Sequence, residues 1–86
     1  MIQYVHIVET KAYYKAQLDC CYEIVSYDDK NLGITSKIDQ DGDNINSYDL
    51  ICRCYPDKEI IEISEEEYYV KRKEVYDLMN ERTSKN

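Results

Sequence analysis

Carboxylates crowd around a glycine in the segment DQDGDN, which is the first place to look for chemistry. Asp39, Asp41 and Asp43 stand at alternate positions beside Gly42, and carboxylate oxygens in a tight loop are ligands that Ca²⁺ prefers. The spacing does not fit a calcium loop. Counted from Asp39, the glycine is fourth rather than sixth, and the twelfth residue is Leu50 instead of glutamate. We interpret the segment as a hairpin tip with solvated acids.

The four cysteines offer a second possible site. Neighbouring residues of a strand point to opposite faces, so Cys20 and Cys21 should diverge, whereas Cys52 and Cys54 should share a face. Four-thiolate zinc sites usually draw on two C-x₂₋₄-C pairs, which this arrangement does not provide. We expect free thiols, with a metal site or a redox role as the alternatives.

An enzymatic role is not expected. The one histidine, His6, lies in an apolar run without a recognisable Ser or Cys nucleophile motif, which favours a structural histidine. Two glycines cannot build a phosphate-binding loop, so no cofactor is expected. Paired catalytic carboxylates remain compatible with the sequence, although so small a chain would struggle to exclude water around them.

The composition favours a module that binds protein. The 86 residues include ten tyrosines but no phenylalanine or tryptophan, and 18 acidic residues outnumber 11 basic ones, for a net charge of −7. Tyrosine is enriched where protein surfaces meet, and an acidic surface repels nucleic acid and anionic lipid. We expect one domain over 1–86 whose partner is the basic surface of a protein, with no direct nucleic-acid or membrane role. With neither an export signal nor a membrane-spanning run, we expect it to be soluble and cytoplasmic.

Alternating hydrophobicity predicts most of the elements. Residues 10–17 suit either a short helix or the start of a long strand, and the D-G dipeptide in 40–44 is a hairpin signal. The expected strands are 2–8, 18–27, 34–38, 45–55 and 59–63, with turns at 28–31, 40–44 and 56–58.

The clearest element is a helix over 64–82. Ser64 followed by Glu67 forms a capping box, in which the hydroxyl and the carboxylate satisfy backbone N–H groups at the helix start. The residues 83–86 should fray. The apolar stripe comprises Tyr68, Val75, Tyr76, Leu78 and Met79, with Tyr69 at its margin.

Together these elements predict an α+β fold, a four- to five-stranded, mainly antiparallel sheet (1–63) with one C-terminal helix packed on one face. If no second helix covers the other face, Tyr27, Val25, Ile51 and Tyr55 would form a contact surface or a homodimer face there.

A meander would gather the acids at the two ends of the sheet. Asp28, Asp29 and Asp57 would share one end. The acidic pole would form at the other end from Asp39, Asp41, Asp43, Glu65, Glu66 and Glu67, with Asp49 beside it. Carboxylates at alternate positions of an extended chain lie ~6.7 Å apart, on the scale of neighbouring phosphates. The alternative is that the glutamates only cap their helix and the aspartates only shape a turn. The expected partner-binding residues are Asp39, Asp41, Asp43, Tyr48, Asp49, Glu65, Glu66, Glu67, Tyr68 and Tyr69.

The closing segment EIIEISEEEYYVKRKEVYDLM, a strand leading into a capped Glu-rich helix, resembles small acidic inhibitors encoded by phages and mobile elements, such as anti-CRISPR and anti-restriction proteins. The resemblance implies an inhibitor of a bacterial defence effector that either covers a basic nucleic-acid groove as a DNA mimic or locks the effector's conformation, and it brings no catalytic residues. The alternatives are an assembly module that dimerises through the open sheet face and a tyrosine-lined nucleotide sponge.

Overall fold

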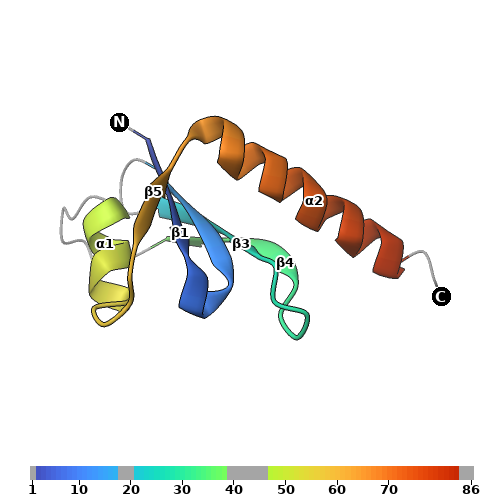
Figure 1. Cartoon of the computed structure of the whole chain (residues 1–86), viewed down its shortest axis with the longest axis horizontal. Helices are drawn as coiled ribbons and strands as arrows, with labels where there is room; N and C mark the ends of the chain where they lie inside the picture. Colours follow the sequence, from blue (N-terminus) through green and yellow to red (C-terminus); the bar gives the residue numbers. More distant parts are fainter. Residues whose placement is uncertain (1, 18–20, 39–46, 84–86) are drawn as a thin grey trace.

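The computed structural model describes residues 2–17, 21–38 and 47–83, which form an antiparallel sheet with a helix on each face (Figure 1). Asp39, Asp41 and Asp43 lie outside the described residues, as does Cys20. The elements are β1 (Gln3–Ile7), a 3₁₀ turn (Val8–Thr10), β2 (Ala12–Ala16), β3 (Cys21–Ser26), β4 (Gly33–Ile38), α1 (Ser47–Cys54), β5 (Ile61–Ile63) and α2 (Glu65–Thr83).

The predicted α+β fold is confirmed. The five strands lie in the order β4-β3-β2-β1-β5, so the first four form a meander and β5 returns to pair with the free edge of β1. The undecided segment 10–17 supplies β2, and the C-terminal helix packs on the sheet.

Strict alternation divides the strand side chains between two apolar layers. In β2, for example, the ring of Tyr14 enters the layer under α1, whereas the ring of Tyr13 enters the layer under α2. The layer under α1 is built from Val5, Ile7, Ala12, Tyr14, Ala16, Tyr22 and Ile51, and the layer under α2 from Tyr4, Tyr13, Val25, Tyr68 and Val75.

The strand predicted over 45–55 is wrong, because residues 47–54 form the helix α1. Tyr48, Ile51 and Tyr55 recur at spacings of three and four, which places them on one side of a helix, where they pack against the sheet. Ile51 is fully buried. Cys52 and Cys54 therefore do not share a strand face; Cys52 is half-buried and Cys54 is exposed.

The expected open sheet face does not exist, since α1 covers it (Figure 1). Tyr27 packs in the layer under α2, whereas Tyr55 packs in the layer under α1, so the two tyrosines lie on opposite sides of the sheet. The expectation of a homodimer face containing both rings is therefore wrong.

The helix α2 begins with the serine half of the predicted capping box, in which the N–H of Glu67 donates to the hydroxyl of Ser64 at 3.1 Å. It runs across the sheet and extends past it toward the C-terminus (Figure 1). Tyr68 and Val75 are fully buried, but Tyr76 and Leu78 are exposed, contrary to the predicted stripe. Within the described ranges, neither helix is long and apolar enough to cross a bilayer.

Candidate functional site

The space between α2 and the sheet combines aromatic rings with polar groups. The rings of Tyr4 and Tyr68 pack with their centroids 5.1 Å apart, and Tyr69 meets Tyr68 edge-on at 5.3 Å. Phenylalanine would fill this space equally well, but the tyrosine hydroxyls reach polar partners at its margins. In the described part of the chain, no buried side-chain nitrogen or oxygen lacks a hydrogen bond.

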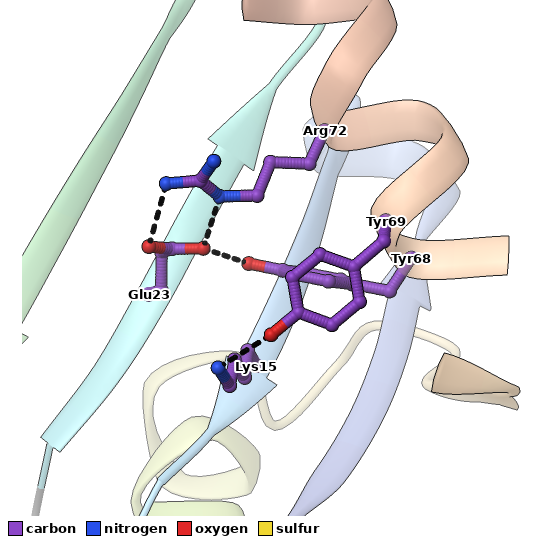
Figure 2. A network of polar contacts seen from close by, with 5 residues as sticks. All are labelled: Lys15, Glu23, Tyr68, Tyr69 and Arg72. Carbon is purple, nitrogen blue, oxygen red and sulfur yellow. Dashed lines mark hydrogen bonds and ion pairs between the residues drawn. The ribbon is translucent and has the colours of Figure 1, made fainter. Parts of the chain in front are cut away.

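A carboxylate network joins α2 to the middle of the sheet. Figure 2 shows Arg72 and Tyr68 reaching from α2 to Glu23 on β3. The Nε of Arg72 donates to Oε1 of Glu23 at 2.9 Å and a terminal nitrogen donates to Oε2 at 3.4 Å, while the Tyr68 hydroxyl donates to Oε1. The Glu23 side chain is only 15% exposed and that of Arg72 is 37% exposed, so this pair is a structural clamp whose carboxylate is largely shielded from water.

The pKa values within the clamp follow from this geometry. Burial alone would raise the pKa of Glu23, but the hydrogen bonds from Arg72 and Tyr68 outweigh it and the net shift is downward. Burial, reinforced by Glu23, raises the pKa of Tyr68. Glu23 therefore stays ionised and Tyr68 stays protonated throughout the physiological range.

Tyr69 lies at the rim of the aromatic layer. Its hydroxyl accepts a hydrogen bond of 2.7 Å from the ammonium of Lys15 (Figure 2). Its ring centroid stands 6.0 Å from that of Tyr4. Burial raises the pKa of Tyr4 to about 12. Because Tyr69 is 40% exposed, part of its ring is available to a partner.

His6 occupies a second polar cluster in the same layer. Its Nε2 lies 2.8 Å from the hydroxyl of Tyr27, and its ring stacks on Tyr13 at 4.1 Å. The ammonium of Lys71 stands 5.2 Å above the ring of Tyr27. His6 thus has the hydrogen-bond partner that a structural histidine needs. Burial lowers the pKa of His6, with Glu67 opposing the shift and Lys71 adding to it.

This environment predicts a specific pH dependence. Since the pKa of His6 is lower in the folded protein than its ordinary 6.5, the unfolded chain binds the proton first, and His6 destabilises the fold as the pH falls below 6.5. Urea unfolding from about pH 7 to pH 5 should show the wild type losing more stability than the His6→Gln variant, which cannot titrate. Parallel stability curves would show that His6 is not held in its neutral form.

The acidic turn, defined as Glu65, Glu66 and Glu67 in the first turn of α2, is the most concentrated exposed charge in the described part of the chain. All three side chains are exposed, and none forms an ion pair with a described residue. The acids further along α2 differ. Lys71 pairs with Glu74 and Lys73 pairs with Asp77, at 2.9 Å each. The exposed Tyr69 and Val70 lie two and three residues after the acidic turn.

Two predicted site residues lie in α1 instead of a strand. Asp49 is exposed in the first turn of α1, and Tyr48 is half-buried against the sheet. The Tyr48 hydroxyl also interacts electrostatically with the carboxylate of Glu62. Glu62 is an exposed acid of β5 that sequence reasoning missed. Glu62 stands opposite Val5, a residue of the layer under α1. The sequence feature that could have pointed to Glu62 is its position in the short strand before the capping box.

Tyr68 is a correction to the predicted site. It is fully buried and its hydroxyl is bonded to Glu23, so no partner can reach it in this fold. Tyr69, one residue later, is the exposed ring. Adjacent helical residues differ by about 100° around the axis, which is why one points into the layer and the next toward the rim.

The acidic pole is tested only in part. Asp28, Asp29 and Asp57 lie at one end of the sheet, as expected, and α2 begins at the other. The last residue of β4, Ile38, is also at the α2 end, but β4 and β5 are opposite edges of the sheet, about 19 Å apart at four strand spacings. The aspartates at 39, 41 and 43 lie outside the described residues.

Within the ranges that the structure describes, no three His, Cys, Asp or Glu side chains are placed to hold a metal ion. Cys21, Cys52 and Cys54 are free thiols.

Comparison with protein-family models, curated proteins and solved structures finds no match to this chain. The resemblance to small phage inhibitors stays a prediction from the sequence.

Proposed function

We propose that this protein is an acidic, non-enzymatic inhibitor that binds the basic surface of a nucleic-acid-binding protein, with a bacterial defence nuclease as the kind of target. The acidic turn carries this proposal. It offers three exposed carboxylates without ion-pair partners among the described residues, whereas Glu74 and Asp77 on the same helix are paired. Unpaired carboxylates gain most from a cationic partner, because no internal pair must first be broken.

The surroundings of the acidic turn suit a protein partner. Tyr69 is part-exposed and Val70 is 56% exposed, so a docking protein would bury aromatic and aliphatic surface beside the charges. Interfaces of this kind combine apolar anchors with a polar rim.

The rigid base beneath the turn supports the same role. Tyr68 and the Glu23–Arg72 pair fix the first two turns of α2 on the sheet, so the carboxylates are held in place before binding. A preorganised surface loses less conformational entropy on association than a mobile one. The inhibitor would act by occupying a groove that nucleic acid otherwise fills.

A matched pair of charge reversals tests the proposal. Glu66→Lys/Glu67→Lys alters the acidic turn, and Asp57→Lys/Glu59→Lys makes the same charge change at the other end of the sheet, where both acids are exposed. The wild type and both variants are immobilised, exposed to bacterial lysate at about 50 mM and 500 mM salt, and the retained proteins are quantified. The retained nuclease is then assayed with and without each protein.

We expect a nucleic-acid-binding protein to be retained and inhibited at low salt by the wild type and by the Asp57/Glu59 variant. The Glu66/Glu67 variant should lose at least about tenfold in affinity, because close charge pairs at interfaces contribute strongly. Equal retention by all three proteins, or retention that does not depend on salt, would contradict the proposal.

A further inference from the structure

The outer edge of β4 exposes a row of backbone groups. Hydrogen bonds from Gln17 to Cys21 and from Tyr27 to Lys11 show that the odd-numbered residues of β3 face β2. The even-numbered residues of β3 therefore bond β4, and through the β3–β4 register they meet Gly33, Thr35 and Lys37. It follows that Ile34, Ser36 and Ile38 direct their N–H and C=O groups outward.

No described strand lies beside this edge. The three residues with outward backbone groups also carry their side chains on the α2 side of the sheet, since Ile34 pairs with Val25 and Ser36 with Glu23. Ile38 is the most exposed large apolar side chain that the structure describes, at 63%. The edge thus combines unsatisfied backbone groups with an apolar side chain that nothing in the described residues covers.

We propose that two copies of this chain pair antiparallel through β4, with the two-fold axis at Ser36. In an antiparallel pair, residues directly opposite one another carry their side chains on the same face of the sheet. When the two strands are identical and related by a two-fold axis, this condition is met only if the axis passes through a residue of the strand. With the axis at Ser36, Ile34 stands opposite Ile38 of the partner subunit, and Ser36 stands opposite its own counterpart. All three outward-facing residues then form hydrogen-bonded pairs, for about six backbone hydrogen bonds.

The side chains fit this register. Ile38 gains the apolar neighbour it lacks, Ile34 of the partner subunit, and a cross-strand pair of β-branched residues favours strand pairing. On the other face Thr35 stands opposite Lys37 of the partner subunit, so no like charges meet directly.

Charge also selects this edge. The chain carries a net charge of −7, so two copies repel one another over most of their surface. The strand Gly33–Ile38 contains no carboxylate and one lysine. The opposite edge, β5, has only three residues with the exposed Glu62 at its centre, and it is the poorer surface for self-pairing.

The substitution Ser36→Pro tests the pairing. Proline removes the outward N–H at the axis but no bond to β3, and edge strands tolerate proline at such positions. Ser36→Ala is the matched control, since it keeps the N–H. Ile38→Lys leaves the backbone unchanged and removes the apolar pair. Circular dichroism and thermal unfolding of each full-length variant establish that the fold is intact.

Sedimentation of the protein alone, from about 1 to 500 µM, gives the readout, since an interface of one strand pair is small and should be weak. We expect dimers of the wild type and of Ser36→Ala at the upper concentrations. The dimer dissociation constants of Ser36→Pro and Ile38→Lys should be at least about tenfold higher. A wild type that stays monomeric throughout would overturn the proposal. It would be overturned in the same way if the edge of β4 binds a different protein, so that Ser36→Pro weakens that binding while the wild type alone stays monomeric. A dimer insensitive to both substitutions would also overturn it. Because no basic partner is present, neither result bears on the acidic turn.

Discussion

The Tyr68→Ala variant should lose about 3–5 kcal/mol of unfolding free energy, the range for removing a large buried aromatic side chain. Tyr68 is fully buried, its ring packs on Tyr4, and its hydroxyl holds Glu23. The truncation leaves a cavity and removes one of the donors to a shielded carboxylate. In a small domain with a total stability of ~5–10 kcal/mol, this brings the protein close to unfolding.

Tyr69→Ala is the matched control, one residue further along α2. Its ring is 40% exposed and its hydrogen bond to Lys15 is at the surface, so the loss should stay below about 1.5 kcal/mol. Urea unfolding followed by circular dichroism measures both variants. Equal losses for the two substitutions would contradict the placement of Tyr68 inside and Tyr69 at the rim.

Ile51→Ala should cost about 2–4 kcal/mol, because Ile51 is fully buried where α1 covers the sheet. On an open sheet face, as the sequence suggested, the same substitution would cost little. Arg53→Ala is the control on the exposed side of α1 and should change stability by less than about 0.5 kcal/mol. A loss for Ile51→Ala as small as that of Arg53→Ala would show that α1 does not pack on the sheet.

The strands were predictable because their pattern is local. In β3, alternate side chains enter one layer or the other, and this period of two is visible in the sequence. The start of α2 was equally readable, since Ser64 and Glu67 are three residues apart and the Ser64 hydroxyl accepts a hydrogen bond from the N–H of Glu67 within a single turn.

The segment around α1 was misread because it satisfies two periods at once. Tyr48, Leu50 and Cys52 alternate as in a strand, whereas Tyr48, Ile51 and Tyr55 recur as in a helix. A helix of eight residues has too little intrinsic stability for its sequence alone to predict it. Packing against the sheet decides between the two structures.

The buried face of α2 depended on a contact that local patterns do not contain. Arg72 belongs to the covered side of the helix because it pairs with Glu23, 49 positions away in the sequence. With Lys71 and Arg72 on that side, Tyr76 and Leu78 turn outward. The same long-range contact decides that Tyr68, rather than Tyr69, is buried, and so which tyrosine belongs to the candidate site.

Charge and architecture together define the surfaces on which this protein can act. The two apolar layers of the sheet are covered by α1 and α2, and two of the surfaces left exposed are the acidic turn and the edge of β4. The first suits a cationic partner and the second suits a strand. The two surfaces belong to opposite edges of the sheet, so one does not block the other.

Hydrogen–deuterium exchange of the protein with and without the nuclease retained from lysate tests the docking role most directly. We predict that binding slows exchange in residues 64–70, which contain the acidic turn with Tyr69 and Val70, while the turn around Asp57 is unchanged. Protection confined to any other part of the chain, with none at 64–70, would contradict the proposal that these carboxylates form the binding surface.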